Sequence, residues 1–420
     1  MVEIKPLERL DATVRIPGSK SYTQRAMVIA ALAEGESRLT EVLIAEDTAI
    51  LAQALEAMGA QIRTKGTEML VRGTGGKLAR PSREIHLGNN GTAMRLLTGV
   101  ASLGEWPIIL TGDARLRKRP LKPLLDALAT LRVETRTEGE LGYPPVTIRG
   151  GRLRGAEIYL RDIESSQYVS ALLIVAPFAS GEVNIFLKGR IPSLPYIALT
   201  VETMGVFGVD VALDGAGHYV VKSGQRYRGR EYRVEGDVSS ASYFFLAAAL
   251  LKGRVRVENI NPRTGQGDIG FLALLERLGC QVLRGENAVE ITGGELPGGE
   301  MTFDLGAMPD MVPTLAVLSA LRRGRSLIRN VAHLRIKESD RLAAMANELR
   351  KTGIAAEELP DGIAITGGTP RGAQIETYND HRIAMSFAVL GLRVPGMKIE
   401  GEECVGKSFP GFWQALEKLS

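Results

Sequence analysis

The strongest constraint on the fold of this chain is a design that the sequence repeats six times. In each copy, a few small polar residues precede an apolar segment of helical length that ends near a glycine or a turn. Successive copies start roughly 70–76 residues apart, a period longer than that of the common solenoid repeats. The polar residues of the six copies stand at positions 19–21, 89–92, 165–167, 239–240, 309–310 and 379–381.

A second series of helices, which are amphipathic, lies between these segments in phase. Each of these helices runs into a strand and is followed by a short strand that closes on glycine, so the repeating unit is predicted to be βαβαββ. The helix-and-strand segments are residues 51–62, 124–135, 201–211, 271–282 and 345–356. The closing strands are residues 69–73, 146–150, 219–224, 289–293 and 363–367.

The two ends of the chain supply the remaining parts of the repeat. A sixth copy of the amphipathic helix is predicted at residues 412–419, with strands from residues 3–17 completing its unit. The chain would then close on itself, with both termini in one domain. A chain of 420 residues is too long for one ordinary core, so we expect two domains. The helices of the first series are apolar on nearly every face, which predicts that they are buried.

The composition is that of an ordinary globular protein, with 45% hydrophobic and 24% charged residues. A formal charge of +4 suits a small anionic substrate as well as it suits nucleic acid. Cys280 and Cys404 stand far apart, which argues against a disulfide framework and a structural zinc site and favours a reducing compartment. The N-terminal residues lack the apolar core of a signal peptide, and no stretch approaches the length of a membrane span. We therefore expect a cytoplasmic protein that does not contact membranes.

Basic residues stand among the small polar residues at the predicted helix starts. They are Lys20, Arg25, Arg95, His381 and Arg382. One interpretation is that the Ser, Asn and Asp residues are ordinary N-caps. The other is that helix N-termini, which carry unpaired N–H groups and a partial positive charge, bind anions here. If six parallel buried helices direct these ends at one place, that place binds anions strongly.

The first of these segments carries the most specific pattern. Residues 17–25 (PGSKSYTQR) put a glycine turn, Lys20 and two hydroxyls at a helix start, with Arg25 about one turn further on. On spacing alone this is either an anion site or an ordinary capped helix. As a whole, the string closely resembles the PGSKS-x-x-x-R signature of the 5-enolpyruvylshikimate-3-phosphate synthases.

The resemblance to this family extends over nearly the whole chain. The further segments that carry it are 87–95 (LGNNGTAMR), 111–120 (TGDARLRKRP), 165–167 (SSQ), 193–196 (SLPY), 235–244 (EGDVSSASYF), 335–341 (RIKESDR), 378–382 (YNDHR) and 404–410 (CVGKSFP). Taken without the family, residues 115–119 are a basic loop on a solvated surface. Residues 335–341 are then a charged helix face with i,i+3 and i,i+4 pairs, and His381 is a hydrogen-bonded structural histidine.

The resemblance implies an α/β fold (in part α+β), a two-domain inside-out α/β barrel with three βαβαββ units around buried parallel helices in each domain. Residues 1–18 and 236–420 would form domain I, on the phosphoenolpyruvate side. Residues 19–235 would form domain II, on the shikimate 3-phosphate side, with the active site in the cleft between the domains. The implied protein is a monomer that acts on these two small molecules without a metal or an organic cofactor and is inhibited by glyphosate.

The implied reaction transfers the enolpyruvyl group of phosphoenolpyruvate to the 5-hydroxyl of shikimate 3-phosphate by addition and elimination through a tetrahedral intermediate. The residues implied in proton transfer are Lys20, Asp310 and Glu338. Those implied in binding phosphoenolpyruvate are Lys20, Asn89, Gly91, Thr92, Arg119, Gln167, Arg341, His381, Arg382 and Lys407. Those implied in binding shikimate 3-phosphate are Lys20, Ser21, Arg25, Ser165, Ser166, Gln167, Ser193, Tyr196, Asp310, His333 and Lys337.

Two residues depart from the family pattern. His333 stands where relatives often carry Asn beside the shikimate phosphate, and Leu96 follows Arg95 where several relatives carry Pro. A third feature, at residues 401–408 (GEECVGKS), fits the Walker A pattern for nucleotide binding. A nucleotide-binding loop must lead straight into a long helix, whereas Pro410 and Gly411 interrupt the start of any helix here. We therefore expect no ATP site.

Two alternative functions remain open from the sequence. One is enolpyruvyl transfer to UDP-N-acetylglucosamine, but that family usually opens with a GAKNA-type motif and carries a reactive Cys or Asp near one quarter of the chain. The other is binding or processing of RNA, which the basic charge suggests. Aromatic residues make up only 5% of the chain, and none are interleaved with the basic runs as a base-stacking surface requires. The sequence motifs and the low aromatic content therefore favour enolpyruvyl transfer to shikimate 3-phosphate over these two alternatives.

Overall fold

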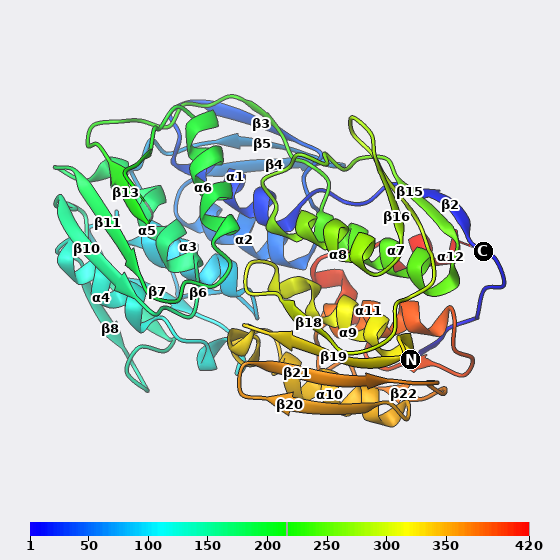
Figure 1. The fold of residues 1–420 in the computed structure, drawn as a ribbon. Helices are drawn as coiled ribbons and strands as arrows, with labels where there is room; N and C mark the ends of the chain where they lie inside the picture. Colours follow the sequence, from blue (N-terminus) through cyan, green and yellow to red (C-terminus); the bar gives the residue numbers. More distant parts are fainter. Residues whose placement is uncertain (216, 420) are drawn as a thin grey trace. The chain divides into compact units, whose positions relative to one another are not determined.

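The computed structural model describes residues 1–215 and 217–419. The chain forms two compact units, which we call unit 1 (Met1–Ser19 with Glu235–Ser420) and unit 2 (Lys20–Val234). The chain therefore passes from one unit to the other twice, after Ser19 and after Val234 (Figure 1). Each unit is built from small sheets and two kinds of helix.

Unit 2 contains three four-stranded sheets with one topology, β14-β3-β5-β4, β6-β7-β9-β8 and β10-β11-β13-β12. In each sheet the first two strands pair in parallel and the others pair antiparallel. The strands are β3 (Glu36–Thr40), β4 (Gln61–Lys65), β5 (Glu68–Arg72), β6 (Ile85–His86), β7 (Ile108–Thr111), β8 (Glu134–Thr137), β9 (Val146–Arg149), β10 (Ala156–Arg161), β11 (Val183–Lys188), β12 (Ala212–Leu213), β13 (His218–Val221) and β14 (Glu231–Arg233).

The helices of unit 2 alternate between a buried and an amphipathic series. The buried helices are α1 (Lys20–Leu32), α3 (Gly91–Ala101) and α5 (Gln167–Val175). The amphipathic helices are α2 (Glu46–Ala57), α4 (Lys122–Thr130) and α6 (Pro195–Val206), and two 3₁₀ turns are η1 (Leu116–Lys118) and η2 (Ala176–Phe178). Helix α3 packs against α5, and α1 packs against α3 and α6. Burial of each large apolar side chain in this core contributes about 1.5–3 kcal/mol.

Unit 1 repeats the arrangement with two four-stranded sheets and one three-stranded sheet, β16-β17-β15-β2, β18-β19-β21-β20 and β1-β23-β22. The strands are β1 (Val2–Glu3), β2 (Asp11–Val14), β15 (Arg254–Val257), β16 (Gln281–Arg284), β17 (Val289–Thr292), β18 (Met301–Asp304), β19 (Gly324–Arg329), β20 (Ala355–Leu359), β21 (Gly362–Gly367), β22 (Gln374–Ile375) and β23 (Lys398–Ile399). Helix α9 packs on β19 and β21, and α10 packs on β20 (Figure 1).

The buried helices of unit 1 are α7 (Val238–Leu251), α9 (Val312–Leu321) and α11 (His381–Gly391), and each packs against the other two. Every residue of α11 is buried, including His381 and Arg382 in its first turn. The amphipathic helices are α8 (Phe271–Arg277), α10 (Arg341–Lys351) and α12 (Phe412–Glu417). The 3₁₀ turns are η3 (Gly267–Gly270), η4 (Pro309–Met311), η5 (Ala332–Ile336) and η6 (Glu402–Lys407).

These elements confirm the predicted α/β fold, with repeated βαβαββ units in two domains. The prediction that strands from residues 3–17 complete the sixth unit is wrong in one respect. Only β1 joins the sixth sheet, whereas β2 pairs in parallel with β15. The strand before the first crossing thus takes the parallel edge position of the sheet that follows the second crossing. Strand β14 does the same in unit 2, where it pairs with β3.

The segment that leaves unit 1 and the segment that returns to it lie side by side at the edge of this unit. Gly18 and Gly236 form an antiparallel bridge, and the backbone N–H of Ser19 donates to the carbonyl of Glu235 at 2.7 Å. The side chain of Asn259 bonds the backbone of Ile16 in both directions. A Cβ atom at Gly236 would clash with the backbone oxygen of Asn259, so this close approach requires glycine.

None of the helices in the described part of the chain combines the length and the apolar character that a membrane span requires.

Candidate active site

In unit 2, the starts of three helices meet at one aspartate. Lys20, the first residue of α1, places its Nζ 3.3 Å from Oδ2 of Asp47, in the first turn of α2. The side-chain amide of Asn90 donates to the backbone carbonyl of Asp47 at 2.8 Å. The amide oxygen of Asn90 accepts from the N–H of Ala93 and so caps α3. These contacts hold the Lys20 ammonium beside the N-termini of α1, α2 and α3, where an anion is favoured.

Arg25 lies one turn into α1 and is fully buried. Its Nε donates to Oγ1 of Thr200 at 2.7 Å, and its Nη2 donates to the carbonyl of Tyr196 at 3.1 Å. Its Nη1 donates to the carbonyl of Ser21 at 3.1 Å. Burial lowers the pKa of Arg25 to about 10. Hydroxyls and carbonyls, rather than a carboxylate, accept these hydrogen bonds, so the guanidinium keeps most of its positive field.

Gln167 joins the starts of α3 and α5. Its Oε1 accepts from Nη1 of Arg95 at 2.9 Å, and its Nε2 donates to Oγ1 of Thr92 at 2.9 Å. The hydroxyl of Ser165 accepts from the backbone N–H of Gln167 at 3.3 Å, and Ser166 precedes the helix directly. Four residues from two predicted motifs are thus brought together.

Arg119 lies against the first turn of α3, where Gly91 has no side chain. A Cβ atom at Gly91 would lie 2.6 Å from both terminal nitrogens of Arg119, so the guanidinium occupies the space that the missing side chain leaves. Its Nη1 is 3.5 Å from the carbonyl oxygen of Asn89. Ser193, which adopts a left-handed backbone, bonds through its carbonyl to the N–H of Tyr196 at the start of α6. Unit 2 therefore presents cations, hydroxyls and amides at the starts of its helices.

In unit 1, one carboxylate bridges two arginines. Oδ1 of Asp310, in η4 before α9, accepts from Nη1 of Arg341 at 2.9 Å. Oδ2 of the same carboxylate accepts from Nη2 of Arg382 at 2.7 Å. Arg341 opens α10 and Arg382 lies in the first turn of α11, so the starts of three helices converge here. Nη1 of Arg382 also lies 3.4 Å from the hydroxyl of Tyr243 on α7.

Two further carboxylates surround Arg341, which is 1% exposed. Its Nε donates to Oδ2 of Asp380 and its Nη2 donates to Oε2 of Glu338, both at 2.8 Å. Asp380 is fully buried and caps α11 by accepting from the N–H of Arg382. The hydroxyl of Ser339 also donates to Asp380, at 3.0 Å. Arg341 is therefore fixed by three acids from three segments.

The charges of this cluster determine its protonation. Burial raises the pKa of Asp310, but the guanidinium groups of Arg382 and Arg341 outweigh burial and hold that pKa well below its usual range. Burial lowers the pKa of Arg341, and Asp380, Glu338 and Asp310 more than reverse this. Asp310 is consequently ionised, and it becomes a better proton acceptor only when the arginines are drawn to another anion.

The other predicted residues of unit 1 lie on nearby elements. Lys337 is close enough for its ammonium to lower the pKa of Asp310. His381 is the first residue of α11 and is fully buried, and His333 is buried in η5. Lys407 is buried at the end of η6, which packs against α11. The Walker-like segment thus forms a 3₁₀ helix rather than a loop that opens a long helix.

Several residues of these clusters were not assigned a role from the sequence. Asp47 belongs to no motif. An acidic residue in the first turn of a helix commonly does no more than stabilise the helix through its dipole. Asn90 and Asp380 were recognised as N-cap positions, but not as partners of Asp47 and Arg341. The signal for Asp380 was present, because an acid beside Arg382 in the string 378–382 has a ready cationic partner.

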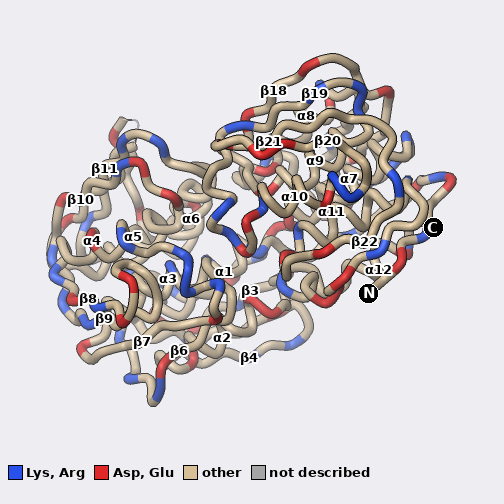
Figure 2. Tube along the Cα trace, turned by 90° about the horizontal axis from the view of Figure 1, so that it is seen from below, with Lys and Arg blue, Asp and Glu red and all other residues tan. Residues whose placement is uncertain are grey.

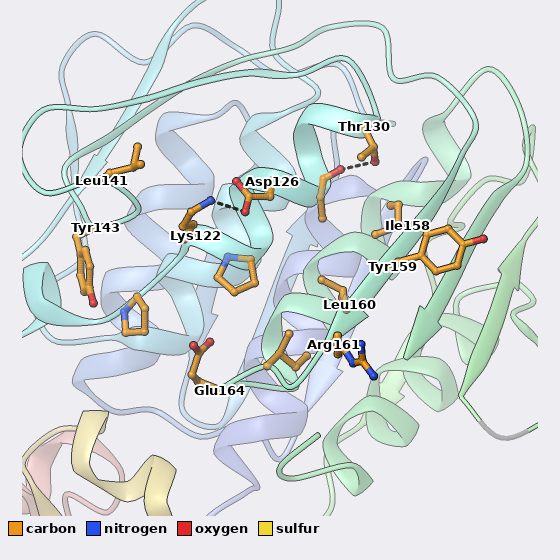
Figure 3. A pocket seen from close by; sticks show the side chains of 14 residues that line it. Lys122, Asp126, Thr130, Leu141, Tyr143, Ile158, Tyr159, Leu160, Arg161 and Glu164 are labelled. Carbon is orange, nitrogen blue, oxygen red and sulfur yellow. Dashed lines mark hydrogen bonds and ion pairs between the residues drawn. The ribbon is translucent and has the colours of Figure 1, made fainter. Parts of the chain in front are cut away.

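A cavity of about 600 Å³ lies elsewhere in unit 2, between α4 and β10 (Figure 3). None of the candidate residues lines it. Lys122 on its wall pairs with Asp126 at 2.6 Å, and Leu141 and Tyr159 are exposed beside it. Among the described residues, no group of three or more His, Cys, Asp or Glu side chains could hold a metal ion. Basic and acidic residues are interspersed over both units, unlike the basic stripe of a nucleic-acid site (Figure 2).

Comparisons with known proteins identify the family of the whole chain. A sequence model of the family described as EPSP synthase (3-phosphoshikimate 1-carboxyvinyltransferase) matches residues 4–416. The chain is 45% identical over 419 residues to the 3-phosphoshikimate 1-carboxyvinyltransferase of Syntrophobacter fumaroxidans, covering 99% of both chains. It is also 45% identical over 411 residues to that of Methanothermobacter thermautotrophicus, covering 98% of this chain and 96% of the relative.

A solved structure of EPSP synthase from Acinetobacter baumannii is similar to the chain with a TM-score of 0.82 and 31% identity, over 100% of this chain and 98% of that one. The match of fold, length and sequence extends over both units. The chain therefore belongs to the EPSP synthase (3-phosphoshikimate 1-carboxyvinyltransferase) family.

Proposed function

We propose that this chain transfers the enolpyruvyl group of phosphoenolpyruvate to the 5-hydroxyl of shikimate 3-phosphate and releases phosphate. Beyond membership of the family, one observation carries the proposal. Arg341 and Arg382 are brought together at converging helix starts and share the carboxylate of Asp310. Two guanidinium groups held in this way suit a ligand that carries both a carboxylate and a phosphate, because each can form bidentate hydrogen bonds.

The proposed phosphoenolpyruvate site draws on both units. Unit 1 supplies Arg341, Arg382, Lys407 and His381. Unit 2 supplies Lys20, Asn89, Gly91, Thr92, Arg119 and Gln167. The contact between Arg119 and Gly91 supports this assignment, since it holds a guanidinium at the N-terminus of α3.

The proposed shikimate 3-phosphate site lies mainly in unit 2. Its residues there are Lys20, Ser21, Arg25, Ser165, Ser166, Gln167, Ser193 and Tyr196, and unit 1 adds Asp310, His333 and Lys337. The bonds of Arg25 to neutral acceptors support a phosphate role, because its positive charge is not cancelled by a carboxylate at these positions. Hydroxyl and amide groups suit a ligand that is itself rich in hydroxyls.

The proposed chemistry has two steps. The 5-hydroxyl oxygen bonds to C2 of phosphoenolpyruvate and gives up its proton, while a proton is added to C3. The C2–O bond to phosphate then breaks as C3 loses a proton. We assign these proton transfers to Lys20, Asp310 and Glu338, as general acids and bases. Binding of the phosphoenolpyruvate anion by Arg341 and Arg382 would weaken their hold on Asp310 and make that carboxylate more basic.

The division of the residues between two units implies a conformational requirement. We propose that binding of substrate brings the residues of the two units to one site, in the manner of other enzymes that close on their substrates. Small-angle scattering with and without shikimate 3-phosphate tests this, and a radius of gyration that stays unchanged would contradict it. The proposal also includes a monomer in the cytoplasm that needs no cofactor and is inhibited by glyphosate.

The deciding experiment is a phosphate-release assay with phosphoenolpyruvate and each of two acceptors. Release with shikimate 3-phosphate and none with UDP-N-acetylglucosamine supports the proposal, and the reverse result overturns it. The cysteines favour the first outcome. Both are free and buried, and burial raises the pKa of Cys404 to about 12, so this thiol is a poor candidate for the reactive Cys of the other family.

A further inference from the structure

A buried acid outside the predicted site lies in a turn that packs against η4, the turn whose Asp310 holds the two arginines of unit 1. Asp268 is in η3, immediately before α8, and is 2% exposed. Its Oδ2 accepts a short hydrogen bond from the hydroxyl of Ser239, in the first turn of α7. Its Oδ1 is buried and has no hydrogen-bond partner among the described residues. Ionisation of a buried carboxyl group with an unpartnered oxygen costs free energy, because its charge is removed from water.

Turn η3 packs against α7, α8 and η4, and charged groups on α7, η4 and α11 act on the carboxyl of Asp268. Asp310 approaches from η4, Arg382 from α11 and Asp237 from the start of α7. The charged residues of α8 lie at its far end, where Glu276 pairs with Arg284 and Arg277 stacks on Phe303. Asp268 therefore has two acids and one shared guanidinium as its charged neighbours.

These neighbours set the protonation of Asp268. Burial and the charge of Asp310 raise the pKa of Asp268 to about 7, against the opposing effects of Arg382 and of the hydrogen bond from Ser239. Asp310 differs because it holds both guanidinium groups directly. The two acids therefore differ in protonation. Asp310 is ionised, whereas Asp268 can hold a proton near neutral pH.

We propose that Asp268 is a positioning residue whose buried carboxyl sets, by gaining or losing a proton, how strongly Arg382 and Arg341 hold an anionic substrate. The inference rests on the proposed function in that it takes this substrate to be phosphoenolpyruvate. An ionised Asp268 adds a negative charge beside Arg382 and opposes the binding of an anion. A protonated Asp268 does not. By linkage, an anion bound at Arg382 must in turn favour the protonated form.

The first test observes the carboxyl directly in the full-length enzyme. With ¹³C-carboxyl aspartate, one resonance is lost in Asp268→Asn, and we expect this resonance to titrate near neutral pH and to shift its midpoint upward when phosphoenolpyruvate is added. If the Asn variant does not fold, Ser239→Ala identifies the same resonance, because loss of the hydrogen bond moves its midpoint upward. A resonance that stays ionised from about pH 5.5 to about pH 8.5, or a midpoint that phosphoenolpyruvate does not move, overturns the proposal.

The second test is kinetic. Between about pH 6 and about pH 8.5, we expect the KM for phosphoenolpyruvate to rise about three- to tenfold more in the wild type than in Asp268→Asn, with a smaller difference in kcat. Asp268→Glu should restore the pH dependence. Glu276→Gln, which removes a carboxylate further along the same segment, should behave as the wild type. Loss of activity in Asp268→Asn by the same factor at every pH indicates a structural role and overturns the proposal.

The two tests separate this inference from the proposed function. An enzyme that binds phosphoenolpyruvate but transfers nothing to shikimate 3-phosphate contradicts the proposed function and leaves the carboxyl titration as it is. An active enzyme whose Asp268 does not titrate contradicts the inference alone.

Discussion

The two units use the same repeat to hold buried arginines in different ways. In unit 2, Arg25 is held by hydroxyl and carbonyl oxygens and Arg95 by the amide of Gln167. In unit 1, Arg341 and Arg382 are held by a group of carboxylates centred on Asp310 and Asp380. Both clusters stand in the first turns of helices, so the backbone does not explain the difference.

The difference has a chemical consequence. A cation held by neutral acceptors keeps its field and binds an anion with little rearrangement. A cation paired with a carboxylate must first give up part of that interaction, and the released carboxylate then becomes more basic. Arg25 and Arg95 of unit 2 are therefore suited to binding, whereas Arg341 and Arg382 of unit 1 are suited to coupling the binding of an anion to the transfer of a proton.

The largest effect should follow from removing the shared carboxylate. Asp310→Asn should reduce turnover by about 10⁴-fold, because it removes both a proton acceptor and the charge that positions two arginines. Phosphate release at saturating substrates measures this. Asp304→Asn changes an exposed aspartate of the same unit and should leave turnover unaltered. Near-normal turnover in Asp310→Asn would remove this residue from the chemistry.

A similar but smaller loss is expected in unit 2. Lys20→Met should reduce turnover by about 10³-fold, since it removes the ammonium at the meeting point of three helix starts. Circular dichroism should show an intact fold. The control is Lys122→Met, which breaks an exposed pair with Asp126 and should cost little. Equal turnover in the two variants would contradict a role for Lys20.

The comparison can be tested most directly by stability. Arg341→Met removes a buried cation that Asp310, Glu338 and Asp380 share, and we expect it to lower the free energy of unfolding of unit 1 by about 3–5 kcal/mol at neutral pH. Arg25→Met loses only bonds to neutral acceptors and should lower that of unit 2 by about 1–3 kcal/mol. Each unit holds one tryptophan, Trp413 in unit 1 and Trp106 in unit 2, so single-tryptophan versions report urea unfolding of each unit separately.

The loss of stability caused by Arg341→Met should depend on pH in the acid range, whereas the loss caused by Arg25→Met should not. The pKa of Asp310 is depressed in the folded state, so its pairing contributes stability above its unfolded pKa of about 4, and this contribution is lost as the pH falls further. The loss caused by Arg341→Met should therefore shrink below about pH 4. The loss caused by Arg25→Met should remain constant over the same range. Parallel curves for the two variants would contradict the contrast between the units.

Much of the fold could be predicted from the sequence, because the spacing of apolar residues marks the helices and strands of each repeat. Helix α9 has no charged residue and no polar face, and its burial follows from that. The pairing of β2 with β15 could not be predicted, since a four-residue strand carries no information on its partner. It depends on where the chain crosses between units.

Prediction of the site succeeded where a motif marks a helix start and failed where a partner is remote. Arg382 and Arg341 stand in recognisable strings, and the structure brings both to Asp310. Asp47 and Asp268 act through contacts with residues 27 and 29 positions away in sequence. Spacing within one helix or turn cannot reveal such contacts, because tertiary packing alone creates them.

The smallest effect concerns how unit 2 positions Arg119. Gly91→Ala places a methyl group against the guanidinium of Arg119, and we expect the KM for phosphoenolpyruvate to rise about three- to tenfold as Arg119 is displaced. Alanine favours a helix over glycine, so stability should not fall. Gly139→Ala, at a position with open space around it, is the matched control. An unchanged KM in Gly91→Ala would mean that Arg119 does not hold this substrate.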